Sequence, residues 1–223
     1  MEINAAAMWL NSAFASFDLG VSRAVHTLAE SASSIMTPFF NFISFLGLGG
    51  ILLILLSLFL IVYKPTRRFG TAMLFGLAIG ALLTNCAVKP LVARPRPYID
   101  ETSEFHKMWL TVGQATESDR SFPSGHTTAA AASMIALFLT TRKKQITWLF
   151  LLFPILMAVS RIYLVVHYPT DVIGGIIVGI ISGIAGYIIT NHLPEKYYEA
   201  DLPPLNWIKG GKDRRQKGGK HCK

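Results

Sequence analysis

The chain has 223 residues, of which 52% are hydrophobic and only 15% are charged, and its mean hydropathy is +0.43. This composition is typical of an integral membrane protein, and it excludes a disordered chain, which would lack the apolar mass. Two cysteines, Cys86 and Cys222, are too few for a disulfide-stabilised secreted module, and the net charge of +8 raises the question of nucleic-acid binding.

The first predicted element is an amphipathic helix over residues 14–30, which we expect to lie in the membrane interface. Its apolar residues recur at helical spacing: Phe17, Val21, Ala24, Val25 and Leu28. The alternative is a membrane span, because residues 5–17 are apolar, although Asp18 and Arg23 would be costly inside a bilayer.

Five further stretches are long enough to cross about 30 Å of hydrocarbon, which takes roughly 20 helical residues. They are residues 31–63, 70–88, 125–141, 145–166 and 172–191. Charged turns separate them, and the fourth carries a single charge, Arg161. The sequence therefore predicts an all-α integral membrane protein, a bundle of five transmembrane helices with an N-terminal amphipathic helix. A sixth span remains the alternative.

The basic residues predict the orientation of this bundle. Five spans place the turns at 64–68 and 142–144 and the tail 196–223 on one face, with fourteen of the 21 lysines and arginines. By the positive-inside rule this face is cytoplasmic, so the protein is a multi-pass protein of the cell membrane with a cytoplasmic C-terminus. We divide the chain into a membrane domain, 1–195, and a basic tail that contacts anionic lipid rather than nucleic acid.

Three segments on the opposite, outward face contain most of the remaining chemistry: 89–97 (K-P-L-V-A-R-P-R-P), 121–126 (S-F-P-S-G-H) and 160–171 (S-R-I-Y-L-V-V-H-Y-P-T-D). Each alone has an ordinary explanation, such as a capped helix start or an interfacial histidine. Arg161 is harder to explain in this way, because an arginine inside an apolar span implies a buried anionic partner.

Together the three segments supply what phosphoryl transfer requires. Lys89, Arg96 and Arg161 are fixed cations that can hold the oxygens of a phosphate, where charge spreads in the transition state. The helix that begins at Gly125 adds unpaired backbone N–H groups, and Ser124 adds a hydroxyl. These residues predict a phosphate-binding site.

Two histidines complete the predicted chemistry. Asp171 lies one helical turn beyond His167 and can accept its ring proton, so His167 is the predicted nucleophile. His126 has no such neighbour and is assigned proton donation to the leaving group. Water then hydrolyses the phosphohistidine, with His126 acting as base.

A metal site is the competing interpretation, since His126, His167 and Asp171 are plausible ligands of zinc or manganese. The fixed cations of the same segments would repel a divalent ion, so we expect no metal and no other cofactor. The carboxylates of the outer loop keep the alternative open: Asp100, Glu101, Glu104, Glu117 and Asp119.

The three segments resemble the signature of the type 2 phosphatidate phosphatase superfamily: K-x6-R-P, then P-S-G-H, then S-R-x5-H-x3-D. This resemblance implies a helical, metal-independent membrane phosphatase with His167 as nucleophile and His126 as general acid. The phosphate-holding role then passes to Lys89, Arg96, Ser124, Gly125 and Arg161, and the orienting role to Asp171. Arg94 and Arg120 lie outside the signature; we assign them supporting or headgroup contacts, with a purely structural role equally open.

The expected substrate is a lipid whose phosphate lies at headgroup depth: phosphatidate, phosphatidylglycerol phosphate or undecaprenyl diphosphate. The loop 98–120 is either a lid that selects the headgroup or a segment that rests on the bilayer. The alternatives are a non-catalytic lipid or anion carrier and a vanadate binder like the haloperoxidases, which share the signature. Gly175, Gly179 and Gly183 fit sliding helices, static packing or a homodimer contact equally well.

Overall fold

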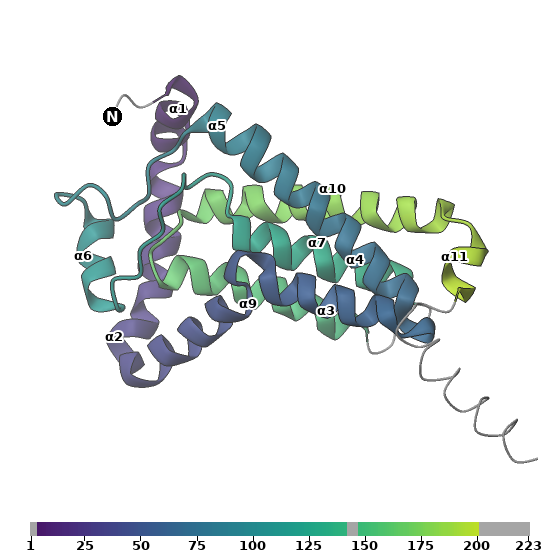
Figure 1. The fold of residues 1–223 in the computed structure, drawn as a ribbon. Helices are drawn as coiled ribbons and strands as arrows, with labels where there is room; N and C mark the ends of the chain where they lie inside the picture. Colours follow the sequence, from purple (N-terminus) through teal and green to yellow (C-terminus); the bar gives the residue numbers. More distant parts are fainter. Residues whose placement is uncertain (1–3, 142–146, 201–223) are drawn as a thin grey trace, which may run out of the picture.

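The computed structural model describes residues 4–141 and 147–200, and the regular secondary structure of these residues is entirely helical (Figure 1). The α-helices are α1 (Ala5–Ala13), α2 (Ala15–Leu46), α3 (Ile51–Val62), α4 (Arg67–Ala81), α5 (Lys89–Val92), α6 (Glu104–Thr111), α7 (Gly125–Thr140), α9 (Leu152–Tyr163), α10 (Pro169–His192) and α11 (Glu195–Glu199). Tighter turns connect some of them at Leu48–Gly50, Lys64–Thr66 and Trp148–Leu151, and a π-helical turn, Leu82–Val88, joins α4 to α5. The predicted all-α class is confirmed.

Among the described residues, two continuous helical stretches are long and apolar enough to cross a membrane, Lys64–Val92 and Pro169–His192. A third span results if α2 and α3, which meet at 50°, count as one, and Gly125–Thr140 and Trp148–Tyr163 are shorter apolar helices. Each of the five predicted spans therefore contains an apolar helix, while their number in the membrane stays a prediction.

The N-terminal part differs from the expected pattern. The amphipathic segment and the first half of the predicted span 31–63 form one helix, α2, which has a kink at Ala32 and ends at Leu46. Gly50 then adopts a left-handed conformation with φ +76°, which glycine tolerates, and α3 starts in a new direction. The first half of α2 runs across the ends of the long helices rather than alongside them (Figure 1).

The burial of α2 also differs from that of a simple amphipathic helix. Phe17 and Leu28 of the predicted apolar face are 43% and 41% exposed, whereas Asp18 is only 2% exposed. The helix thus turns apolar side chains outward and a carboxylate inward. This arrangement suits a helix in lipid better than one in water.

The centre of the bundle consists of α10 packed against α7 and α4 through glycines. A Cβ at Gly179 would lie 2.5 Å from Ala131 Cβ, and one at Gly183 2.7 Å from the Ala132 carbonyl oxygen. Likewise, a Cβ at Gly175 would lie 2.7 Å from the Ser124 carbonyl oxygen. These contacts show close packing within one chain, which is one of the three uses predicted for these glycines, beside sliding helices and a homodimer contact. The packing sets α10 directly against the start of α7.

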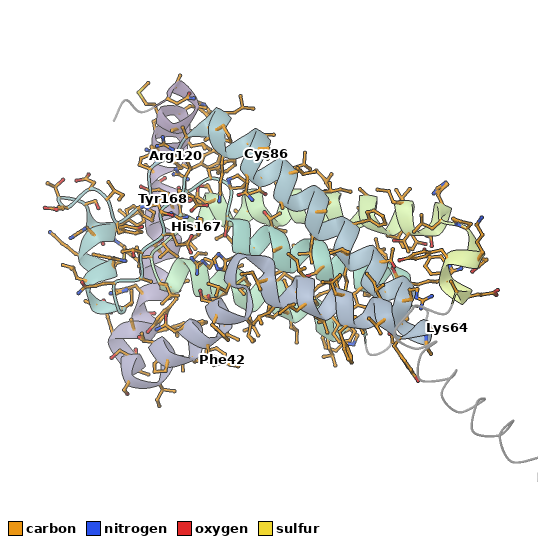
Figure 2. The ribbon with its side chains drawn as sticks, viewed as in Figure 1. Phe42, Lys64, Cys86, Arg120, His167 and Tyr168 are labelled. Carbon is orange, nitrogen blue, oxygen red and sulfur yellow. The ribbon has the colours of Figure 1, made fainter. Side chains whose placement is uncertain are left out.

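The two ends of the bundle differ in character. His167, Tyr168 and Arg120 lie at the end where α1 and α6 are also found, hereafter the site end (Figures 1 and 2). Lys64 and α11 lie at the opposite end. The described part of the predicted tail, 196–200, therefore lies far from the site end, and its remainder lies outside the described residues.

Candidate active site

The first predicted segment leaves the bundle at the site end. The π-helical turn brings the chain to Lys89, which is 7% exposed, and Ala93 ends α5 in a left-handed conformation with φ 50°. The chain then continues without regular structure through Arg94 and Arg96, which are 1% and 3% exposed. Buried cations of this kind require anionic or hydrogen-bonding partners.

The second segment forms the start of α7. Ser124 is the N-cap, and its hydroxyl oxygen accepts a hydrogen bond from the Thr127 backbone N–H. A Cβ at Gly125 would lie 3.5 Å from Lys89 Nζ, so this glycine stands beside the ammonium group. The structure places Ser124 in a capping role in addition to its position beside the predicted phosphate site.

The third segment turns sharply between α9 and α10. Val165 has φ 53°, a left-handed conformation that a β-branched residue seldom adopts and that costs about 1–3 kcal/mol. This turn aims the Val166 carbonyl at Arg96 Nη1, 2.8 Å away, and brings His167 Nε2 to 3.0 Å from the same nitrogen. The strained backbone thus sets the position of His167 against Arg96.

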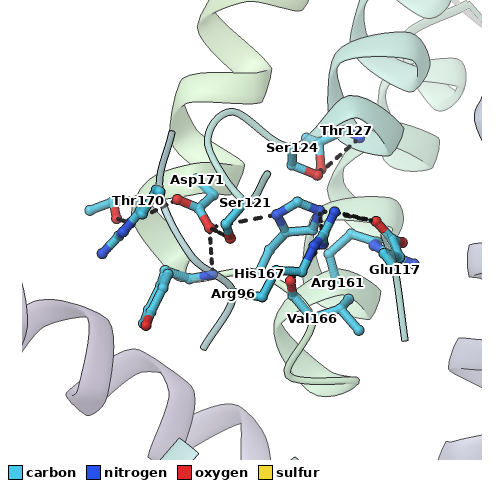
Figure 3. A network of polar contacts seen from close by, with 12 residues as sticks. Arg96, Glu117, Ser121, Ser124, Thr127, Arg161, Val166, His167, Thr170 and Asp171 are labelled. Atoms are coloured by element: carbon cyan, nitrogen blue, oxygen red, sulfur yellow. Dashed lines mark hydrogen bonds and ion pairs between the residues drawn. The ribbon is translucent and has the colours of Figure 1, made fainter. Parts of the chain in front are cut away.

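Asp171 lies on the other side of the imidazole, as the spacing predicts (Figure 3). His167 Nδ1 is 3.5 Å from Asp171 Oδ2, longer than a typical hydrogen bond, and Nδ1 has no hydrogen-bond partner among the described residues. Catalytic hydrogen bonds are often long before substrate binds. The same carboxylate accepts hydrogen bonds from the Tyr168 backbone N–H, at 2.9 Å, and from the Ser121 hydroxyl.

Two of the three predicted cations, Arg96 and Arg161, and both histidines lie around one carboxylate, that of Glu117. Figure 3 shows this carboxylate beside Arg96, Arg161 and His167. Arg96 Nη2 lies 2.6 Å from Glu117 Oε2, and Arg161 donates to Oε1. His126 Nδ1 is 3.6 Å from Oε1 and His167 Nε2 is 3.8 Å from Oε2. An anionic group at this position is therefore faced by two guanidinium groups and two imidazoles.

A second carboxylate, Asp119, holds the remaining cation. It forms ion pairs with Lys89 and with Arg96, and its backbone carbonyl accepts a hydrogen bond from Arg96 Nε at 3.0 Å. Partial burial opposes ionisation of Asp119, but the hydrogen bond and charge of Lys89 and the charge of Arg96 outweigh it and lower the pKa of this carboxyl.

The electrostatics favour a neutral imidazole at His167. Its burial, and then the positive charges of Arg96 and Arg161, hold its pKa well below the usual value. A neutral ring keeps one unprotonated nitrogen at neutral pH, which a nucleophile needs. With the ring proton on Nδ1 this nitrogen is Nε2, which in this structure accepts a hydrogen bond from Arg96 Nη1 at 3.0 Å. Among the described residues, no group of three or more His, Cys, Asp and Glu side chains is arranged to hold a metal ion.

Four residues at this site are not among the site residues predicted from the sequence. Glu117 and Asp119 were recognised only as acids of the outer loop, Ser44 of α2 accepts a hydrogen bond from Arg161, and Asp18 of α2 pairs with Arg94. The sequence carries one indication of the acidic residues among them. Four cations buried at one site need anionic partners, and these cations are Lys89, Arg94, Arg96 and Arg161. Arg120 is half-buried at the site end (Figure 2).

A bundle of apolar helices with buried cations and two histidines gathered at one end is the arrangement of a membrane protein with a polar site at one end. The sequence profile of the PAP2 superfamily matches residues 69–194, and the chain belongs to this superfamily. The predicted resemblance is thereby confirmed, and the match includes all three predicted segments.

Named relatives share most of their length with this chain. Undecaprenyl-diphosphatase BcrC of Bacillus subtilis is 32% identical, over 73% of this chain and 79% of its own. Phosphatidylglycerophosphatase B of the same organism is 32% identical, over 74% of this chain and 87% of its own. The crystal structure of Aquifex aeolicus LpxE superposes with a TM-score of 0.61 at 26% identity, covering 75% of this chain and 93% of that one. The predicted class, a membrane-associated phosphatase of this superfamily, is confirmed.

Proposed function

We propose that this protein hydrolyses a lipid phosphomonoester or diphosphate at the outer face of the cell membrane, through a phosphohistidine on His167. The observation that carries the proposal is the convergence of Arg96, Arg161, His126 and His167 on the Glu117 carboxylate. Groups that hold a carboxylate between two guanidinium planes can hold two oxygens of a phosphate in the same way.

In the proposed reaction the substrate phosphate takes the place of the Glu117 carboxylate. Arg96 and Arg161 hold its oxygens and stabilise the charge of the transition state. The Nε2 lone pair of His167 forms a bond to phosphorus while the bond to the leaving oxygen breaks, and His126 gives that oxygen a proton. Water then attacks the phosphohistidine, His126 takes the proton of the water, and inorganic phosphate leaves.

The shape of the adjoining cavity supports a lipid substrate. This cavity has a volume of about 250 Å³ and is lined at the site end by Lys89, Asp119 and His126. Away from the site its lining includes Ile54 and Leu77, on α3 and α4. A phosphate at the polar end would leave the hydrocarbon beside apolar side chains. The relatives' names mention undecaprenyl diphosphate and phosphatidylglycerophosphate, and with phosphatidate these are our candidate substrates.

The loop 98–120 supports the lid interpretation. Trp109 of this loop stacks on Tyr98 at 5.0 Å and donates a hydrogen bond to the Ala115 carbonyl. The loop therefore packs on itself and delivers Glu117 and Asp119 to the cations. We propose that it selects the headgroup of the substrate.

The outward orientation is supported by the distribution of charge. Lys64 and α11 lie at the end opposite to the site (Figures 1 and 2), and the positive-inside rule assigns the basic end to the cytoplasm.

The test is phosphate release by the purified protein in detergent, with undecaprenyl diphosphate, phosphatidylglycerol phosphate and phosphatidate compared by turnover. We expect release to persist in excess EDTA, to be inhibited by vanadate, and to be abolished by His167→Ala. Radiolabelled substrate should leave an acid-labile label on the wild type and none on His167→Ala. His192→Ala is the matched control, because His192 is exposed near the opposite end of the bundle. Release that needs a metal, or that survives in His167→Ala, overturns the mechanism, and no release from any of these lipids favours the carrier alternative.

A further inference from the structure

The guanidinium of Arg94 is held on every side by buried polar groups. Its Nη1 donates to Asp171 Oδ1 and to Thr170 Oγ1, each at 2.7 Å, and its Nη2 donates to Asp18 Oδ2 at 2.8 Å. Its Nε donates to Asn11 Oδ1, also at 2.8 Å. All three nitrogens are thus used, and two of the partners come from α1 and α2 at the N-terminus.

Asp18 is bound as tightly as Arg94. It is 2% exposed and accepts hydrogen bonds from the Thr170 backbone N–H at 2.9 Å and from the Thr170 hydroxyl at 2.8 Å. Thr170 is the second residue of α10, so Asp18 caps that helix from a different part of the chain. Asp18 therefore contacts α10 directly as well as through Arg94.

Two carboxylates share one guanidinium in this group. The side chains of Asp18, Arg94 and Asp171 are 2%, 1% and 0% exposed. Burial removes water from a charge of either sign, so each of these charges depends on its partners. With Arg94 bound to Asp171 alone, its full charge would offset that of the carboxylate facing His167. Because Asp18 also interacts with Arg94, the positive charge of Arg94 offsets less of the charge of Asp171. The negative potential of Asp171 at the imidazole of His167 is then greater.

The geometry of Asp171 links this group to the proposed nucleophile. Arg94 holds Oδ1, and this leaves Oδ2 facing His167 Nδ1 at 3.5 Å (Figure 3). The rotation of the carboxylate is thus set by Arg94 at Oδ1, together with the Ser121 hydroxyl and the Tyr168 backbone N–H at Oδ2. We infer that Asp18, acting through Arg94, is a positioning residue that orients Asp171 and thereby His167, so that α2 belongs to the catalytic apparatus. This inference rests on the proposed roles of His167 and Asp171.

The first test is Asp18→Asn, which keeps the shape of the side chain and removes its charge. We expect kcat to fall about ten- to a hundredfold, the usual range when a group that orients a reactive ligand is lost. The inhibition constant of inorganic phosphate, which the cations hold without a bond to His167, should change less than about twofold, because Asp18 does not contact the phosphate-binding residues. The matched control is Arg23→Gln, which removes an exposed ion pair between α2 and Glu104 and should leave both quantities unchanged.

A double-mutant cycle separates positioning from a merely structural role. If Asp18 acts through Asp171, Asp18→Asn should change the rate of Asp171→Asn by less than about twofold, measured as single-turnover release with enzyme in excess. A purely structural role of α2 would instead multiply the two losses, and that result would overturn the inference. Should Asp18→Asn fail to fold, Thr170→Val removes the hydroxyl that joins Arg94 to Asp18, and the same criterion applies. His167→Ala distinguishes the two proposals: an active His167→Ala refutes the proposed mechanism, whereas an inactive one with multiplied losses refutes only the positioning role.

Discussion

Each buried arginine among the described residues contacts more than one polar partner. Arg67 illustrates this away from the active site: the sequence places it in a solvated basic turn, yet it is 0% exposed. Its Nη1 donates to the carbonyls of Tyr197, Tyr198 and Ala200, at 3.0, 3.1 and 2.6 Å, and its Nε donates to that of Ile61 at 2.9 Å. One side chain therefore satisfies the carbonyls of two segments at the end opposite to the site.

We expect Arg67→Ala to destabilise the protein by about 2 kcal/mol or more, because it leaves several buried carbonyls without donors. The neighbouring Arg68 pairs with Glu195 at the surface, where the two side chains are 42% and 70% exposed, and its guanidinium lies over the Tyr198 ring at 4.4 Å, so Arg68→Ala should cost less than about 1 kcal/mol. Thermal unfolding in detergent measures both. Equal losses for the two variants would show that Arg67 contributes no more than a surface charge.

At the scale of the element, the proposed function makes the loop 98–120 a competitor of the substrate for the same cations. Glu117 is 22% exposed at its side chain and occupies the position that we assign to the phosphate. On this proposal, binding of substrate displaces Glu117, and the free energy of breaking its ion pairs is subtracted from the affinity.

Glu117→Gln should strengthen binding of phosphate-like anions, because it removes the competing charge. We expect the inhibition constant of vanadate to fall about tenfold, which corresponds to about 1.4 kcal/mol. The control is Glu101→Gln, an exposed acid of the same loop. Weaker inhibition by vanadate in Glu117→Gln would mean that Glu117 helps to hold the substrate instead of competing with it.

The elements also show how far the sequence predicts the site. His126, His167, Lys89, Arg96 and Arg161 could be identified because their spacing lies within short segments and the alternation of apolar helices brings these segments to one end. Asp18 could not be placed beside them, because its contact with Arg94 depends on how α2 crosses the bundle, which hydrophobic periodicity does not encode. Similarly, an uncharged stretch, 31–63, gives no sign of the bend at Gly47–Gly50, since glycines are common inside membrane helices.

At the scale of the whole molecule, the bundle exposes apolar side chains along its length and gathers its ionic groups at the two ends. Ile54, Phe59, Ile177 and Ile184 are 37%, 71%, 53% and 41% exposed, which in water would make a large unfavourable surface. In a bilayer the same side chains face lipid, and association of the helices depends on close packing such as that of α10 on α7. This distribution is the one we expect if the two polar ends lie at the two membrane surfaces.

This polarity makes the proposed orientation measurable. In a Cys86→Ser, Cys222→Ser background, Glu101→Cys marks the site end and Lys196→Cys marks the end with α11; both positions are exposed. A maleimide that does not cross membranes should label Glu101→Cys in intact cells and Lys196→Cys only after permeabilisation, because the positive-inside rule retains the basic end in the cytoplasm. The reverse pattern would place the phosphatase site in the cytoplasm. The chemistry of His167 would be unaffected by that result, but the substrate would then have to be a lipid phosphate of the inner leaflet, so the labelling decides which pool of lipid the enzyme can reach.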